Sequence, residues 1–125
     1  MDETREWQHT WHSLRELLGS KWAFHVLRAL TEGECRFSEL ERAVEGMTAT
    51  MLSRRLKELA CHGFVERSVS ETHPPRTTYR LTPSGQEFAH HLRAMEDLVS
   101  VRDCADGEAC APDATDSRCL TLADC

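Results

Sequence analysis

The chain has few lysines and no long apolar segment. Only two of its 15 basic residues are lysines, Lys21 and Lys57, and the others are arginines. No uninterrupted run of about 18 apolar residues occurs, which argues against a membrane-spanning helix. The first ten residues are charged and lack the apolar core of a secretory signal. We therefore expect a cytoplasmic protein with no membrane partner.

Motifs that would indicate catalysis are also missing. The sequence contains no G-x-S-x-G elbow, no phosphate-binding loop and no H-E-x-x-H zinc motif. We therefore predict a protein that is not an enzyme and that needs no resident cofactor. With 125 residues, the chain is expected to fold as one main domain.

The acidic residues are concentrated away from the middle of the chain. The formal net charge is -6, which is unusual for a protein that binds nucleic acid. Residues 48–80, however, carry six basic and three acidic residues, a local balance of +3. Residues 101–125 carry six acidic and two basic residues, a balance of -4. Acidic residues combined with few lysines are typical of a salt-loving host, although a GC-rich genome has the same effect on lysine content.

Apolar residues at helical spacing predict two helices in the first 30 residues. The first helix ends near Gly19 and presents one stripe of large apolar side chains: Trp7, Trp11, Leu14 and Leu18. Ser20 is expected to cap the second helix. The buried face of that helix is predicted to be Ala23, Val26, Leu27 and Leu30. A third helix, expected to be capped by Ser38, follows a short extended piece at residues 35–37.

The fourth helix is predicted to follow a tight turn at Gly46 and to be capped by Thr48. Gly63 ends it. Its core-facing residues are Leu52, Leu56 and Leu59. The residues left on the outward face are Ala49, Thr50, Ser53, Arg54 and Lys57. A helix, a short glycine turn and a second helix form the pattern whose second member enters the major groove of DNA.

Two strand-like runs, 64–69 and 77–81, flank a stiff turn that contains Pro74, Pro75 and Arg76. Thr82 and Pro83 then start a last helix. Its apolar stripe is predicted to be Phe88, Leu92, Met95 and Val99. The fold class is therefore mainly α with a small β-hairpin, a winged helix-turn-helix. We place this domain at residues 1–101 and expect residues 102–125 to be a flexible, acidic, cysteine-containing tail.

The residues from about Leu14 to Leu98, about two-thirds of the chain, resemble the HxlR-type winged helix-turn-helix regulators. The resemblance rests on five ordered segments: Leu17–Trp22, Arg36–Leu40, Met51–Leu59, Gly63–Arg67 and Pro74–Thr82. It implies a transcription factor that binds double-stranded DNA as a homodimer and responds to a small molecule or an oxidant. It also implies that the first and last helices pair across the two-fold axis. The residues expected in that interface are Trp7, Trp11, Leu14, Leu18, Phe88, Leu92 and Met95.

Arg54 is the strongest candidate for reading a base, because a guanidinium group can donate two hydrogen bonds to guanine. The full set of predicted DNA contacts is Thr48, Thr50, Ser53, Arg54, Arg55, Lys57 and Arg76. Arg55 lies between the two faces of its helix. The sequence therefore allows either a DNA contact or a salt bridge within the protein for this residue. Arg76 at the wing tip suits a minor groove, where negative potential attracts arginine.

The aromatic residues Trp22, Phe24, Phe37 and Tyr79 are expected to pack in the core rather than to line a ligand pocket. His9 and His12 on the first helix and His90 and His91 on the last are expected to be ordinary solvated or packed histidines.

Four cysteines in the tail follow the pattern C-x5-C-x8-C-x5-C: Cys104, Cys110, Cys119 and Cys125. This spacing fits the C-x2–4-C knuckles of structural zinc sites poorly. A redox or metal-sensing element and a tail without a function both remain open. The family pattern has a cysteine before its first helix, whereas no cysteine precedes Cys35 here. The alternative function is a metal- or redox-binding adaptor that uses a winged helix for protein contacts.

Overall fold

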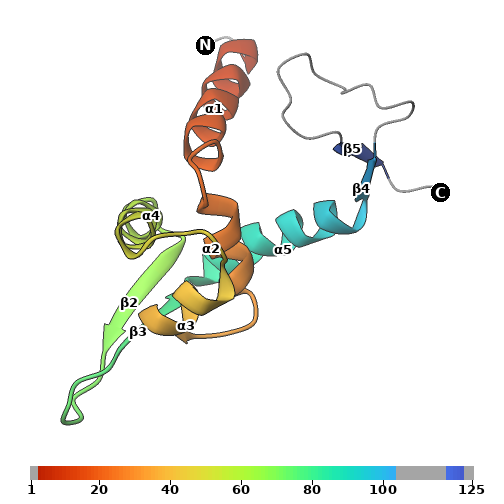
Figure 1. Ribbon diagram of the computed structural model, residues 1–125. Helices are drawn as coiled ribbons and strands as arrows, with labels where there is room; N and C mark the ends of the chain where they lie inside the picture. Colours follow the sequence, from red (N-terminus) through yellow and green to blue (C-terminus); the bar gives the residue numbers. More distant parts are fainter. Residues whose placement is uncertain (1–2, 104–117, 123–125) are drawn as a thin grey trace. The chain divides into compact units, whose positions relative to one another are not determined.

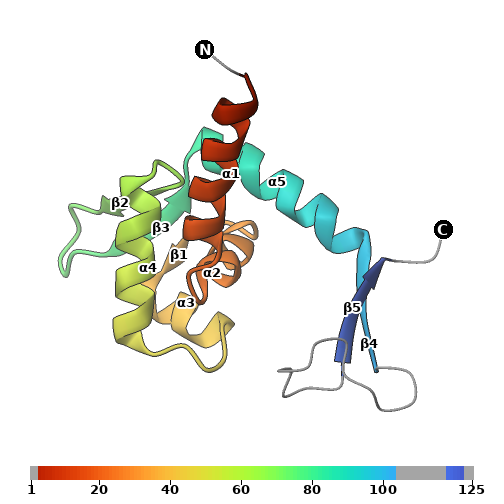
Figure 2. The ribbon, with the colours of Figure 1, turned by 90° about the horizontal axis from the view of Figure 1, so that it is seen from above.

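The computed structural model describes residues 3–103 and 118–122. The chain forms two compact units, which divide between Ala89 and His90 inside helix α5. Figure 1 labels the helices and strands of both units except β1, which Figure 2 labels. The first unit contains four helices, a three-stranded sheet and the start of α5. No helix in the described part of the chain is long and apolar enough to cross a membrane.

Helices α1 (Glu3–Leu18) and α2 (Ala23–Leu30) are joined by a short turn. The apolar face predicted for α2 is confirmed, because Ala23, Val26, Leu27 and Leu30 are all buried. The prediction that Ser20 caps this helix is wrong. The Ser20 hydroxyl donates to the carbonyl oxygen of Glu16 in the preceding helix, and Trp22 occupies the N-cap position.

Helix α3 (Phe37–Ala43) is followed by α4 (Ala49–Cys61) after a turn. The prediction that Ser38 caps α3 is also wrong. The N-cap is Arg36, two residues earlier, and the Glu39 carboxylate accepts the backbone N–H of Arg36 at 3.0 Å. The cap of α4 is confirmed, since the Thr48 hydroxyl accepts the backbone N–H of Met51 at 3.2 Å.

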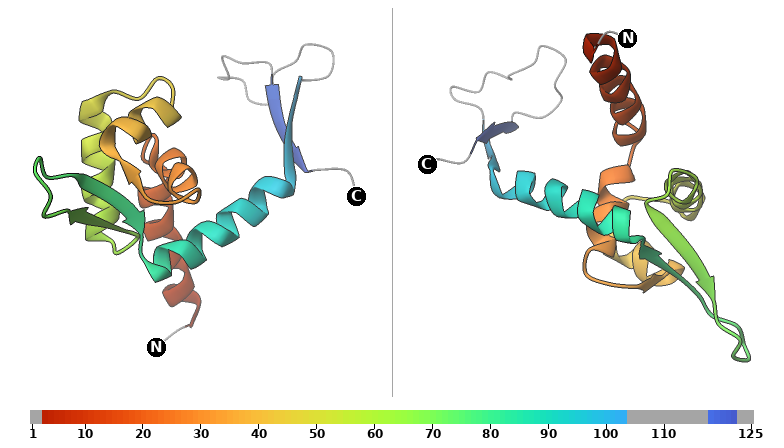
Figure 3. Two further views of the ribbon diagram at one scale, coloured as in Figure 1. Left: turned by 90° about the horizontal axis from the view of Figure 1, so that it is seen from below. Right: turned by 180° about the vertical axis from the view of Figure 1, so that it is seen from behind.

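The sheet consists of strands β1 (Cys35–Arg36), β2 (Val65–Val69) and β3 (Thr77–Leu81) in the antiparallel order β1-β3-β2. In its register, Arg67 lies opposite Tyr79 and Cys35 lies opposite Tyr79 on the other side of β3. The loop between β2 and β3 projects away from the helices of the first unit, as all the views in Figure 3 show. This hairpin is the wing predicted from the sequence.

A single apolar core joins α2, α3, α4 and the sheet. Its most buried side chains are Val26, Leu27, Leu40, Leu52 and Leu59, each with no more than 2% of its surface exposed. Full burial of one such side chain contributes about 1.5–3 kcal/mol. Val65 and Leu81, which lie opposite each other in β2 and β3, close the core from the sheet side. Figure 2 shows α4 lying beside the sheet and α2. The core therefore fixes the orientation of α4.

Helix α5 (Pro83–Asp97) starts as predicted, with the Thr82 hydroxyl accepting the backbone N–H of Gly85 at 2.9 Å. Thr82 also donates from its hydroxyl to the carbonyl oxygen of Gly63 at 2.6 Å. A methyl group on Gly85 would collide with the carbonyl oxygen of Phe64. The beginning of α5 is therefore packed directly against the segment that follows α4.

The second unit contains a feature absent from the predicted elements. Strands β4 (Val99–Asp103) and β5 (Arg118–Leu122) pair in antiparallel fashion, with Val99 opposite Leu122. Val99 was expected in the apolar stripe of the last helix, but α5 ends at Asp97 and Val99 begins a strand. The expectation that regular structure stops near Val101 is likewise wrong, because β4 continues to Asp103 and β5 follows.

Candidate nucleic-acid interface

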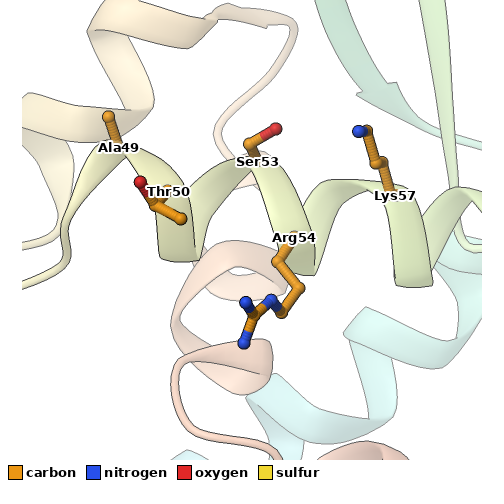
Figure 4. A pocket seen from close by; sticks show the side chains of 5 residues that line it. All are labelled: Ala49, Thr50, Ser53, Arg54 and Lys57. Carbon is orange, nitrogen blue, oxygen red and sulfur yellow. The ribbon is translucent and has the colours of Figure 1, made fainter.

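Helix α4 has one buried face and one outward face. Leu52, Leu56 and Leu59 are buried in the core, so the opposite side of the helix must face away from it. The side chains on that opposite side line an open pocket: Ala49, Thr50, Ser53, Arg54 and Lys57. Figure 4 shows these five side chains projecting from α4. They are the residues that the helical spacing assigned to the outward face.

The polar atoms of this face form a compact set of hydrogen-bond donors. Thr50 and Ser53 carry hydroxyl groups, Arg54 carries a guanidinium fork and Lys57 a point charge. Arg54 and Lys57 are exposed, and within the described residues neither takes part in a salt bridge. An unpaired cation on the outward face can bind a phosphate or a base edge without first breaking an interaction in the protein.

Local backbone geometry explains where this face begins and ends. Gly46 adopts a φ of 87°, which glycine tolerates far better than other residues, and so closes the turn between α3 and α4. Thr48 then caps α4, and Gly63 has a φ of 84° just after the last turn of the helix. The two glycines therefore lie just outside the two ends of α4.

Arg55 differs from its neighbour Arg54. Its side chain is only 13% exposed, and its Nη1 atom donates to Glu58 Oε2 at 2.6 Å. Its Nε atom is buried and has no hydrogen-bond partner in the described residues. This geometry favours the salt-bridge alternative that the sequence left open. The pair stabilises α4 modestly, by about 0.2–0.5 kcal/mol for a pair three residues apart.

Arg76 lies in the wing loop immediately before β3, at the base of the loop and not at its tip as the sequence suggested. Its side chain is exposed, and Ser70 on the other arm of the loop holds its backbone. The Arg76 N–H donates to Ser70 Oγ at 2.9 Å, and the Ser70 N–H donates to the Arg76 carbonyl oxygen at 2.8 Å. Sequence reasoning overlooked Ser70. Its signal was a hydroxyl residue just after a strand, since serine side chains commonly bond to nearby backbone groups in turns.

The wing carries two further arginines, Arg67 on β2 and Arg80 on β3. Arg80 pairs with Glu66 across the strands, with 2.7 Å between Nε and Oε1. Arg67 is exposed on β2 and was counted in the local charge without being assigned a contact. It adds to the positive charge of the wing, whereas the charge of Arg80 is largely balanced by Glu66.

The predicted dimer residues fall into two groups. Trp7 and Trp11 on α1 are 54% and 64% exposed, and Met95 on α5 is 58% exposed. Leu14, Leu18 and Leu92 are half-buried. Phe88 is half-buried as well, and its ring packs on Phe64 of the same chain with 4.8 Å between ring centres. Phe88 therefore already contributes to the packing of its own domain.

Among the aromatic residues expected in the core, Phe24 is 42% exposed, so its expected burial is wrong. It lies next to Ala23 on α2, and only the face of the helix marked by Ala23, Val26 and Leu27 turns inward. Trp22, Phe37 and Tyr79 are half-buried.

The described cysteines differ in accessibility. Cys61 is a free, exposed thiol at the end of α4. Cys35 is half-buried, and burial, followed by the nearby Glu39 carboxylate, raises the pKa of its thiol. A raised pKa lowers the thiolate fraction and makes Cys35 less reactive. Cys104, Cys110 and Cys125 lie outside the described residues, and Cys119 is the second residue of β5. Within residues 3–103 and 118–122, no three potential metal ligands come together.

Comparison with known proteins gives consistent matches. Residues 17–103 match the family described as HxlR-like helix-turn-helix. The HTH-type transcriptional regulator sll1512 of Synechocystis sp. is 39% identical over 95 residues, which cover 76% of this chain and 69% of that protein. The HTH-type transcriptional regulator YtfH of Escherichia coli is 35% identical over 82 residues, covering 66% of this chain and 65% of that protein. The chain thus spans about two-thirds of the length of these relatives.

Solved structures agree with the sequence matches. The reduced form of the transcriptional regulator YodB from B. subtilis superposes with a TM-score of 0.63 at 32% identity, over 68% of this chain and 83% of that one. The redox regulator HypR in its oxidized form gives a TM-score of 0.64 at 29% identity, over 69% of this chain and 89% of that one.

Proposed function

Because this chain belongs to the HxlR-like helix-turn-helix family, whose relatives are transcriptional regulators, we propose that it binds specific duplex DNA sequences through α4. The observation that supports this proposal most is the outward face of α4. Thr50, Ser53, Arg54 and Lys57 line one open pocket on a helix that the core holds in place. Thr50, Arg54 and Lys57 are exposed, and within the described residues the two cations form no salt bridge. A helix of this kind fits the major groove, where each base pair presents a distinct set of donors and acceptors.

The residues of this face divide by chemistry. Arg54 has the planar fork that matches guanine O6 and N7, so we assign it to base reading. Thr50, Ser53 and Lys57 are assigned to phosphates or to neighbouring base edges. Thr48 is assigned to the DNA backbone near the start of α4, although its hydroxyl already caps the helix. Arg55 is assigned a supporting contact at most, because its guanidinium group is engaged by Glu58.

The wing supplies the second contact. Arg76 lies at the base of the wing loop, where Ser70 holds its backbone, so the backbone loses little conformational entropy when the wing meets DNA. We assign Arg76 to the minor groove or its bordering phosphates, where the negative potential favours a guanidinium group. This contact is expected to add affinity with little sequence preference.

The protein acts as a homodimer in this proposal, with α1 and α5 at the interface. Trp7 and Trp11 leave more than half of their surfaces exposed, and large exposed apolar side chains on a small domain commonly mark a partner surface. Two-fold symmetry then places two α4 helices on one duplex. The operator is expected to be a pseudo-palindrome with half-sites about one helical turn, or a multiple of it, apart.

An oxidant is the proposed effector. YodB and HypR are described as regulators in reduced, diamide-treated or oxidized forms, and their structures resemble this chain. We propose the exposed Cys61 thiol and the four tail cysteines for such a role, whereas the raised pKa of Cys35 disfavours it. The expected consequence of oxidation is a change in dimer geometry and hence in DNA affinity.

The direct test starts from a random-sequence duplex library. Wild-type protein should enrich a defined sequence, which should then outcompete random duplex at the same salt concentration by about a thousandfold or more. Equal competition by the two DNAs would show a winged helix without sequence preference and would contradict the proposal. Repeating the titration after diamide treatment, with wild type and with a variant carrying serine at the four tail cysteines, tests the effector. If diamide treatment leaves the DNA affinity of the wild type unchanged, the proposed oxidant response is wrong, whereas the proposed DNA binding through α4 is unaffected.

A further inference from the structure

Trp22 has an unusual backbone conformation at the junction of α1 and α2. Its φ is 80° and its ψ is -4°, in the left-handed region. It is the one residue other than glycine with a positive φ among the described residues. A bulky aromatic side chain rarely occupies this region, and such strain persists where surrounding contacts hold the residue in place.

The contacts of the Trp22 ring explain what holds it. A Cβ atom added to Gly46 would lie 3.3 Å from Cη2 and 3.6 Å from Cζ2 of Trp22. A side chain at position 46 would therefore be in tight contact with the outer edge of the indole. His25 packs edge-on against the indole with 4.8 Å between ring centres, and Lys21 Nζ lies 5.3 Å from the ring centre. The indole Nε1 is buried and has no hydrogen-bond partner in the described part of the chain.

Gly46 lies two residues before Thr48, the cap of α4. The turn that contains Gly46 therefore determines where α4 begins. A ring that rests against this turn limits its position, and through it the position of Thr50 and Arg54 on the first two turns of the helix.

We propose that Trp22 is a positioning residue for DNA reading, which acts through Gly46 on the turn between α3 and α4. This inference rests on the proposed function of α4. Hydrogen bonds to base edges depend on close geometry, whereas attraction to phosphates is long-ranged and tolerant. A displaced turn should therefore reduce the preference for the selected sequence more than it reduces binding to random DNA.

The test uses two glycines with similar backbone angles. Gly46→Ala places a methyl group against Trp22, and Gly63→Ala places one at a φ of 84° with nothing within 4 Å. Both variants incur the strain of alanine at positive φ, but only the first meets the indole. The ratio of affinities for the duplex selected by wild type and for random duplex should fall about threefold or more in Gly46→Ala relative to Gly63→Ala. Thermal unfolding of both variants measures the strain that they share.

Trp22→Phe, alone and combined with Gly46→Ala, completes a double-mutant cycle. Phenylalanine lacks the outer indole atoms that face Gly46, so the methyl group of Gly46→Ala should be accommodated and its loss of specificity should shrink in the double variant. Equal ratios in Gly46→Ala and Gly63→Ala, or additive effects in the double variant, would overturn the inference. If the wild type still prefers its selected duplex, those results would leave the proposed function of α4 intact. A wild type that shows no preference for any duplex would contradict both the proposed function and the role of Trp22.

Discussion

Arg54→Ala is the substitution that separates DNA reading from folding. The Arg54 side chain is exposed on the outward face of α4, and it forms no salt bridge within the described residues. Its loss should therefore change the free energy of unfolding by no more than about 0.5 kcal/mol. A two-bond contact to guanine contributes about 1–3 kcal/mol of discrimination, which corresponds to an affinity loss of about 5- to 150-fold per site.

Fluorescence anisotropy with the selected duplex and a set of single-base variants measures this loss. Arg54→Ala should lose affinity for the selected duplex. It should also bind equally well to duplexes that differ at one guanine position in each half-site. Lys57→Ala is the matched control on the same face. It should weaken binding to all duplexes alike and reduce the salt slope by about 1. A uniform loss across all duplexes for Arg54→Ala, or a fall in its unfolding temperature that accounts for the lost binding, would refute the base-reading role.

Three further substitutions test other parts of the structure. Arg76→Ala should weaken binding to selected and random duplexes alike by about 1 kcal/mol, or fivefold, and unchanged titrations at moderate salt would argue against a wing contact. Thr48→Ala removes the cap of α4 and should lower the free energy of unfolding by about 1 kcal/mol in chemical denaturation; no change would mean that water replaces the cap without loss. Replacement of Trp7 and Trp11 together by serine should shift the protein towards monomer in sedimentation analysis while leaving the fold intact, since both side chains are exposed in the single chain. An unchanged dimer would place the interface elsewhere.

Helix α4 could be predicted well from the sequence because the residues that define it are close together in the chain and indicate the same helix. Leucines at spacings of four and three define its buried face, Thr48 its start and Gly63 its end. All of these lie where the spacing placed them. The outward residues follow from the buried ones by geometry alone. The contacts that these residues make with DNA stay predictions.

The caps of α2 and α3 were mispredicted because a serine near a helix start has alternatives. Ser20 bonds back to Glu16, which extends the hydrogen bonding of α1. Ser38 lies inside α3, where Glu39 satisfies the backbone of Arg36 instead. Composition alone does not distinguish these outcomes, because serine side chains bond to backbone groups on either side of them.

Non-local features were the least accessible to sequence reasoning. The pairing of β4 with β5 joins residues 15 to 23 positions apart, and no short hairpin pattern in the sequence predicts it. The left-handed conformation of Trp22 and the closeness of its indole to Gly46, 24 residues later, were not predicted, because no local signal in the sequence indicates either one. Arg55 was ambiguous for a similar reason, since its choice between DNA and Glu58 depends on how deeply the core buries it.

Methylation interference on the selected duplex tests the central claim most directly, since methylation of guanine N7 blocks contacts in the major groove. The proposal predicts interference at guanines in two major-groove segments on one face of the duplex, about 10 base pairs or a multiple of that apart. Arg54→Ala should abolish the interference at one guanine in each segment. Interference confined to a single segment, or none in the major groove, would contradict a dimer that reads DNA with two α4 helices.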